Sequence, residues 1–300
     1  MDIVSVVKSD GKFLAECIRK GISLIGGWGL GNVPVIIKPN LCTETDVSGG
    51  ATVSSKFVKV VIDEIIRERE DSTIKIVESD SRGKYIDKAF ENLGFLQLVN
   101  EYRNYDVSLV NLSKERATLI SKEFGGLRLP DILLEPNIFI SIGKAKTSGI
   151  TGVTGVLKNQ FGCLPEKNKV KYHRCVDDVI AFINKIILPD LCIVDGIIGM
   201  EGSTMGKIGK LGVLIFGYSP VSVDATMTRV LGIDPLEIKH ILISEKYGLG
   251  SINPRIVGEQ IESVVMKFRK PSVSVFGKYI PETLYPIAKK IYRLVGDRTL

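Results

Sequence analysis

Short apolar runs alternate with longer segments of mixed polarity along most of the chain. The runs are rich in Val and Ile, and several are apolar throughout, as is typical of strands in a sheet covered by helices on both faces. They predict strands at residues 3–7, 33–37, 74–77, 107–110, 138–142, 191–194 and 213–216. The segments between them space their apolar residues as helices do, which predicts helices at 12–24, 55–69, 87–93, 175–187, 222–230 and 236–247.

Two of the predicted helices have start signals. Ser54 or Ser55 can cap the helix at 55–69, and Ser219 with Pro220 can open the helix at 222–230. The alternation of strands and helices predicts an α/β fold with a mainly parallel, doubly wound sheet and helices on both faces. In such folds ligands bind beyond the carboxyl ends of the strands, so a site is expected in the segments that follow them.

The chain divides into a long α/β domain, residues 1–265, and a basic C-terminal extension, residues 266–300. A polar stretch at 113–126, which ends in two glycines, is a candidate boundary between two lobes of the domain. Two lobes and one continuous sheet are equally open interpretations. In the extension, Pro286 can begin a short amphipathic helix that Gly296 ends.

The net charge is concentrated at the C-terminus. The chain has 40 Lys and Arg against 34 Asp and Glu, a formal charge of +6. Residues 266–300 hold eight of these cations and two of the anions, so residues 1–265 carry 32 of each sign and are neutral. Nucleic-acid-binding proteins usually spread a basic stripe over the folded body, so we expect no nucleic-acid partner. A composition with 44% hydrophobic and 25% charged residues also excludes a disordered chain.

Several features favour the cytoplasm. No run of about 18 apolar residues lacks a charge, so no transmembrane helix is expected. The N-terminus has an acid at Asp2 and continues as a predicted strand, unlike a signal peptide. The five cysteines are odd in number and widely spaced, which argues against an extracellular disulfide framework.

Lysines and glycines follow two of the predicted strands. Pro39 ends strand pairing and presents Lys38 and Asn40 at the end of the second strand. The segment 143–159 has glycines that let backbone amides converge on an oxyanion, and lysines that add positive charge. Its candidate ligand-binding residues are Lys144, Lys146, Thr147, Gly149, Gly152, Lys158 and Asn159. The structural alternative for the segment with Lys38 is a solvated turn. For the segment 143–159 it is a tight loop packed on a helix.

Histidines and acids supply further candidates. His173 precedes a helix and is a candidate proton shuttle, while His240 lies in an amphipathic helical pattern and is interpreted as structural. Asp195 ends an apolar strand, and Glu201 lies in the glycine-rich loop beyond it, where the two acids could bind a metal or orient a substrate. Asp80 is a further candidate metal ligand, although capping is the commoner role of such a residue.

The motifs together resemble one protein family. They are Lys38-Pro39-Asn40, Lys144-Ala145-Lys146-Thr147, Lys158-Asn159-Gln160-Phe161-Gly162-Cys163, Tyr172-His173, Val194-Asp195-Gly196 with Met200-Glu201-Gly202, and Val223-Asp224-Ala225. Their order and spacing over about residues 1–265 are similar to those of the domain-of-unknown-function family numbered 362, common in archaea and anaerobic bacteria. The resemblance assigns no reaction, but it implies that the strand-end residues share one pocket.

The sequence departs from the family pattern in two ways. The segment resembling Lys144-Ala145-Lys146-Thr147 usually continues with His, and here Ser148 follows. If that histidine is catalytic in relatives, this chain uses other chemistry or leaves His173 to act alone. Some relatives also carry a ferredoxin-like module and are called iron–sulfur cluster-binding proteins. That module needs closely spaced cysteines, which this chain lacks.

Three hypotheses for function follow. The first is an enzyme or binding protein for a small carboxylate or phosphate. Lys38, Lys158 and His173 are then the catalytic candidates, and a desolvated lysine could act as base or nucleophile. Its cofactor is unknown, and a divalent metal is compatible with it.

The second, weaker hypothesis is an iron–sulfur or redox accessory protein that uses Cys42, Cys163 and Cys175. The third is docking of the C-terminal helix on the protein's own body or on a second subunit, which we prefer, or on a membrane surface.

Overall fold

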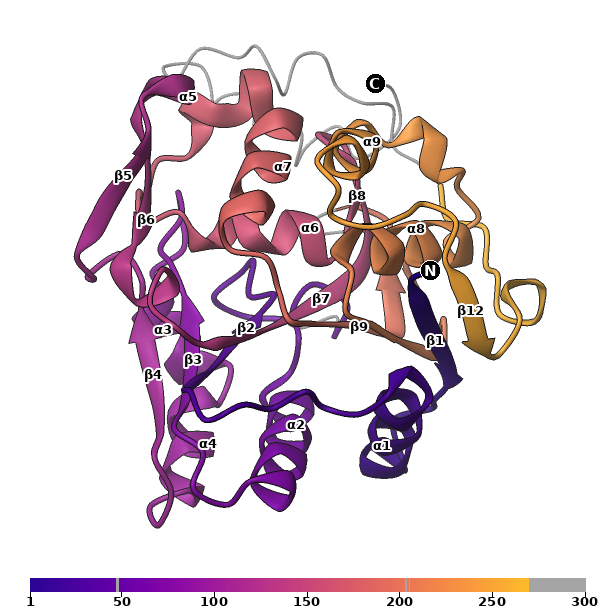
Figure 1. The fold of residues 1–300 in the computed structure, drawn as a ribbon, viewed down its shortest axis with the longest axis horizontal. Helices are drawn as coiled ribbons and strands as arrows, with labels where there is room; N and C mark the ends of the chain where they lie inside the picture. Colours follow the sequence, from indigo (N-terminus) through magenta and orange to yellow (C-terminus); the bar gives the residue numbers. More distant parts are fainter. Residues whose placement is uncertain (47–48, 203, 205, 270–300) are drawn as a thin grey trace.

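A ten-stranded sheet runs through the centre of the molecule (Figure 1). The structure is a computed structural model, and it describes residues 1–46, 49–202, 204 and 206–269. The strands of this sheet are β1 (Ile3–Lys8), β2 (Val35–Pro39), β3 (Ile74–Glu78), β4 (Val107–Asn111), β7 (Ile138–Ser148), β8 (Gly152–Thr154), β9 (Leu191–Met200), β10 (Ile208–Gly209), β11 (Val213–Gly217) and β12 (Arg255–Gly258). Their order is β12-β1-β11-β9-β7-β2-β3-β4, with β8 paired to β7 and β10 to β9.

The sheet is mostly parallel. Strands β9, β7, β2, β3 and β4 are neighbours in this order, and each pairs in parallel with the next. Strand β11 is antiparallel to both β1 and β9. The predicted α/β fold with a mainly parallel sheet is therefore confirmed, and the carboxyl ends of the five parallel strands meet along one edge.

Helices cover both faces of the sheet (Figure 1). One face carries α1 (Leu14–Ile25), α2 (Ser55–Glu68), α3 (Ile86–Asn92) and α4 (Phe95–Glu101). The other carries α6 (Val156–Asn159), α7 (Val176–Ile186), α8 (Pro220–Val230) and α9 (Lys239–Lys246). On β2, Val35 and Ile37 join the core of the first face and Ile36 that of the second. Because successive side chains point to opposite faces, a strand buried on both sides must be apolar throughout.

The predicted helix starts are confirmed for α2 and α8. The Ser54 hydroxyl accepts a hydrogen bond from the Phe57 amide, and the Ser219 hydroxyl accepts one from the Ser222 amide, with Pro220 in the first turn. Each cap satisfies an amide that has no partner inside its helix. Both helices therefore begin where the sequence indicates.

The polar stretch at 113–126 contributes to a separate two-stranded sheet. Strand β5 (Ala117–Ser121) pairs antiparallel with β6 (Leu127–Pro130), and α5 (Glu123–Gly126) joins them. Strands on both sides of this stretch in the sequence belong to the central sheet, which is continuous.

The predicted amphipathic helix of the extension, between Pro286 and Gly296, lies outside the described residues. Within the described residues, no helix is both long enough and apolar enough to span a membrane.

Candidate functional site

A cavity of about 260 Å³ lies where β2, β3 and β7 end, beside α6. This is the edge at which a doubly wound sheet binds ligands. Its polar and charged lining consists of Lys38, Asn40, Cys42, Glu78, Ser79, Ser81, Arg82, Lys84, Lys146, Thr154, Lys158, Asn159, Lys167, Lys169 and His173. The candidates Lys38, Asn40, Lys146, Lys158, Asn159 and His173, which lie far apart in the sequence, thus come together in one place.

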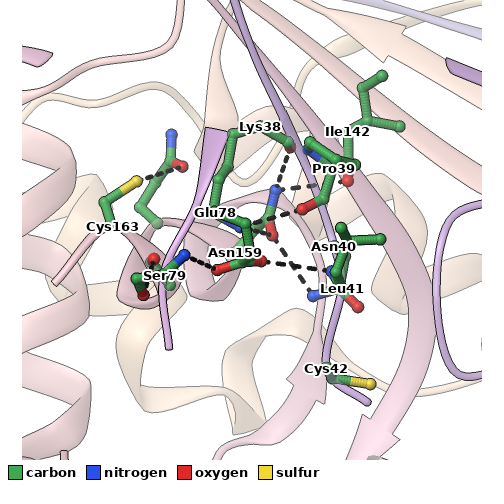
Figure 2. Close-up of polar contacts among 12 residues, drawn as sticks. Lys38, Pro39, Asn40, Leu41, Cys42, Glu78, Ser79, Ile142, Asn159 and Cys163 are labelled. Atoms are coloured by element: carbon green, nitrogen blue, oxygen red, sulfur yellow. Dashed lines mark hydrogen bonds and ion pairs between the residues drawn. The ribbon is translucent and has the colours of Figure 1, made fainter. Parts of the chain in front are cut away.

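A buried ion pair between Lys38 and Glu78 is part of the cavity lining, and Figure 2 shows its contacts. Lys38 Nζ lies 2.6 Å from Glu78 Oε2 and also donates to the Pro39 carbonyl at 3.0 Å. Burial alone would raise the pKa of Glu78, but the ammonium groups of Lys38 and Lys84 outweigh burial and hold that pKa below its usual value. Glu78 is therefore an ionised counter-charge rather than a proton donor.

Asn159, on α6, forms hydrogen bonds with residues at the end of β2 and in β7 (Figure 2). Its Nδ2 donates to the Lys38 carbonyl at 2.8 Å and to Ser141 Oγ at 3.1 Å. Its Oδ1 accepts from Lys38 Nζ at 3.2 Å and from Asn40 Nδ2 at 3.4 Å. A side chain that uses both ends of its amide in this way fixes the geometry around it. Asn159 therefore orients the site's lysine and asparagine.

Lys146 extends from the long strand β7 into the same cavity. Its Nζ donates to Asn40 Oδ1 at 3.0 Å and to the Ala51 carbonyl at 2.6 Å, and it lies 3.3 Å from Cys42 Sγ. The side chain is 1% exposed, so the ammonium group is held by protein oxygens in place of water.

The pKa values of two further lysines are lowered in this environment. Lys158 Nζ donates to Ser148 Oγ at 2.8 Å, and burial, together with the charge of Lys146, lowers the pKa of Lys158 to about 7. Lys169 Nζ donates to Ser79 Oγ at 3.0 Å, and burial lowers the pKa of Lys169 to about 8. Burial penalises the charged form of each amine because it removes water.

The cavity has an excess of positive charge among the described residues that line it. Its basic side chains are Lys38, Arg82, Lys84, Lys146, Lys158, Lys167 and Lys169. Glu78 is the carboxylate of this lining, and it is shared by Lys38 at 2.6 Å and Lys84 at 3.6 Å. Arg82 and Lys167 are exposed, whereas Lys38, Lys84 and Lys169 are buried.

Some residues predicted for the ligand lie elsewhere. Lys144 Nζ forms a buried ion pair with Asp195 Oδ2 at 2.7 Å, outside the cavity lining. The pairing of β7 with β9 shifts register between Lys144 and Lys146, and this irregularity separates their surroundings. Thr147 Oγ1 accepts from the Gly202 amide. Gly149 and Gly152 are also absent from the lining of the cavity.

The acids proposed as metal ligands have separate partners. Asp80 Oδ1 accepts from the Ile86 amide at the start of α3, Asp195 pairs with Lys144, and Glu201 Oε1 accepts from the Arg269 amide. No three His, Cys, Asp or Glu side chains lie close enough to hold a metal ion in the part of the chain that the structure describes. The structure therefore does not assemble the predicted set Asp80, Asp195 and Glu201 into a metal site.

Among the described residues, the cysteines of the iron–sulfur hypothesis do not form a cluster that could hold a metal ion either. Cys42 lines the cavity, whereas Cys163 is buried in the core and Cys175 packs against that core. Burial raises the pKa of Cys163 to about 12 and also raises that of Cys175, which disfavours the thiolate form that binds iron.

The two histidines occupy different environments. His173 lines the cavity, with its ring centroid 6.5 Å from that of Phe161. His240 is fully buried, and its Nδ1 lies 3.7 Å from Asp177 Oδ1. This location is compatible with the structural interpretation of His240 and leaves His173 as the histidine that reaches the cavity.

Sequence reasoning missed several residues of the site. Lys84, Lys167 and Lys169 are not among the candidates from the sequence, and neither are Glu78 and Arg82, which flank the candidate metal ligand Asp80. Glu78 was detectable from the sequence, because it directly follows the strand predicted at 74–77, as Lys38 follows the strand predicted at 33–37. Lys169 carries none, since it lies in an irregular loop before a 3₁₀ helix at Val170–Cys175.

A buried carboxylate supports the helix that presents Lys158 and Asn159. Asp224, on α8, accepts from the Val156 amide at 2.7 Å and from the Leu157 amide at 3.0 Å, the first amides of α6. Burial raises the pKa of Asp224 to about 7, although the two amides oppose this. The short helix α6 thus starts on a buried carboxyl group from another element.

Fold and cavity together define the class: an α/β protein with a doubly wound, mostly parallel sheet and a basic cavity at the carboxyl ends of its strands. The profile of the family described as "Domain of unknown function (DUF362)" matches residues 35–229. The chain belongs to this family. The match includes every described residue of the cavity lining.

A curated relative is similar along nearly the whole chain. It is the thylakoid-associated protein sll1697 of Synechocystis sp. (strain ATCC 27184 / PCC 6803 / Kazusa), 27% identical over 311 residues. The aligned region covers 96% of this chain and 94% of the relative. No solved structure matches the chain significantly.

Proposed function

We propose that the protein binds a small anionic ligand, a carboxylate or a phosphate, in the cavity and acts on it as an enzyme of the cytoplasm. The observation that carries the proposal is the charge of the cavity lining, in which seven basic side chains face one carboxylate. Buried charges without a counter-charge are costly, and an anion entering the cavity would offset that cost.

The pKa values of two lysines support the same conclusion. Burial lowers the pKa of Lys158 to about 7 and that of Lys169 to about 8, because positive charge is poorly solvated in this cavity. An anion nearby favours the charged form of an amine. Binding would therefore raise both pKa values and take up protons at neutral pH.

The size of the cavity limits the ligand. At about 260 Å³, it has room for a compact molecule, since one water molecule occupies about 30 Å³ of the liquid. The exposed Arg82 and Lys167 in its lining could attract an anion before the buried lysines contact it. A sulfate-sized group or a short carboxylate fits these limits.

Calorimetric titration with sulfate, phosphate and malonate tests the proposal. Wild-type protein should bind at least one of these anions saturably at pH 6.5, and Lys158→Met should bind it at least about tenfold more weakly. The control is Lys56→Met, because Lys56 is an exposed lysine on α2 outside the cavity lining. Equal affinities of Lys158→Met and wild type, or no saturable binding of any of the three anions, would contradict the proposal.

The affinity should also depend on pH in a definite direction. Between pH 6 and pH 9 sulfate keeps its charge, whereas Lys158 and Lys169 lose protons near pH 7 and pH 8. Sulfate should therefore bind most tightly below pH 7 and weaken by about tenfold or more by pH 9. In Lys158→Met the decline near pH 7 should disappear and the decline near pH 8 should persist. A flat profile in the wild type is the contrary result.

The relative's name supports a second candidate, attachment to a membrane surface. The relative is called thylakoid-associated, and this chain's basic extension has the composition of a membrane-surface helix. Flotation of full-length protein with vesicles of anionic lipid should then exceed that of a variant truncated after residue 265. Equal flotation would favour docking of the extension on the protein itself or on a second subunit.

A further inference from the structure

The amine of Lys158 differs from those of its neighbours in the cavity. Lys38 and Lys84 share the carboxylate of Glu78, and Lys169 donates to Ser79 Oγ and the Asp80 carbonyl. Among the described residues, Lys158 has one polar contact, with Ser148 Oγ at 2.8 Å. The side chain keeps partial exposure, and it lines the cavity. Of these amines, that of Lys158 is the one best placed to react with a ligand.

Lys158 is also able to become neutral. Burial and the charge of Lys146 lower its pKa to about 7, and the opposing charge of Asp177 only partly offsets this. About half of the ligand-free molecules then carry an unprotonated amine at pH 7, and a bound carboxylate lowers that share. For an exposed lysine of ordinary pKa the share is about one in 2,500. A lysine desolvated beside another cation is a recognised form of amine nucleophile.

The groups around Lys158 can hold an acid while its amine reacts. Lys146 lies near enough for its charge to shift the titration of Lys158, and it lines the same cavity with Asn40. The ammonium group of Lys146 already donates to Asn40 Oδ1 and the Ala51 carbonyl, so the exposed cations of this lining that a carboxylate can reach are Arg82 and Lys167. A 2-oxo acid is the smallest acid that also carries a carbonyl group, which suits a cavity of about 260 Å³.

We propose that Lys158 forms an imine with the carbonyl carbon of a small 2-oxo acid whose carboxylate is held by the other basic side chains of the cavity. The proposal rests on the proposed function, because it uses the same anion site. The Nζ lone pair attacks the carbonyl carbon, and the carbonyl oxygen takes up a proton to give a carbinolamine. That hydroxyl then leaves as water after a second protonation, while the nitrogen gives up its protons and forms the C=N bond. No oxidant or reductant is needed.

Borohydride trapping tests this step on the full-length protein. Pyruvate and glyoxylate, each followed by borohydride, should give about one stable adduct per chain, located on Lys158 by peptide mass spectrometry. Acetone, a carbonyl compound without a carboxylate, should give at least about tenfold less. Sulfate should protect Lys158 because it occupies the same cavity.

The matched variant is Lys158→Arg, which keeps the positive charge but cannot form an imine. It should lose the adduct, whereas the exposed-lysine variant Lys56→Met should form it as the wild type does. If wild-type protein binds sulfate but neither oxo acid labels Lys158, the imine is wrong and the anion site stands. If labelling falls mainly on exposed lysines, or is equal with acetone, the imine is likewise overturned. If sulfate does not bind either, the proposed function fails with it.

Discussion

Replacement of Lys38 by methionine should lower the free energy of unfolding by about 3–5 kcal/mol. The substitution removes the ammonium group 2.6 Å from Glu78 Oε2 and leaves that buried carboxylate facing Lys84 at 3.6 Å. A charge that loses its partner in the interior retains its full cost of desolvation. The pKa of Glu78, now held low by Lys38, should rise in the variant.

Urea denaturation of two comparison variants separates the ion pair from the loss of packing. The double variant Lys38→Met, Glu78→Gln should recover part of the loss, because it leaves no uncompensated carboxylate. Lys114→Met, which removes the exposed partner of Asp87, should leave the urea midpoint nearly unchanged. If the double variant is less stable than Lys38→Met, the account of the ion pair is wrong.

Replacement of Gly155 by alanine should destabilise the protein by about 3 kcal/mol and reduce anion binding. A Cβ at Gly155 would lie 2.1 Å from Asp224 Oδ1, a carboxylate that is itself fully buried. The carboxylate would have to move away from the Val156 and Leu157 amides, to which it now accepts hydrogen bonds. The start of α6, and with it Lys158 and Asn159, would shift.

Gly149→Ala is the matched control, in the same glycine-rich segment. A Cβ there would meet no described atom within 4 Å, so thermal unfolding and sulfate affinity should both stay close to those of the wild type. Equal effects of the two substitutions would mean that the segment is sensitive to any added methyl group. The contact with Asp224 would then have no special role.

Most of the central sheet was predictable because its strands are buried on both faces. The runs at β1, β2, β3, β4, β7, β9 and β11 were all predicted, and in β2 and β11, which are buried along their whole length, burial on both sides favours continuous apolar residues. Strand ends were less visible. Strand β7 continues to Ser148 through Lys144 and Lys146, whose polar character hides the strand. The helix α4 and the hairpin β5–β6 were missed for a similar reason, because neither has a long periodic pattern.

The candidate site was predicted in part. Lys38, Asn40, Lys146, Lys158, Asn159 and His173 lie around one cavity, as the strand-end rule implies. Lys144 was expected there because it follows a predicted strand in a segment rich in lysine and glycine, whereas the structure gives it Asp195 as partner, beside a register shift in the pairing of β7 with β9. Lys169 could not be found, because its position depends on how an irregular loop folds back over β3. Such tertiary contacts leave no local pattern in a single sequence.

A crystal structure with selenate tests the central claim most directly, because its anomalous signal locates the anion. Selenate has the charge and shape of sulfate. The account predicts an anomalous peak inside the cavity, with an anion oxygen about 3 Å from Lys158 Nζ and loss of that peak in Lys158→Met. Anomalous peaks confined to exposed lysines, with none in the cavity of wild-type crystals grown at pH 6.5, would contradict it.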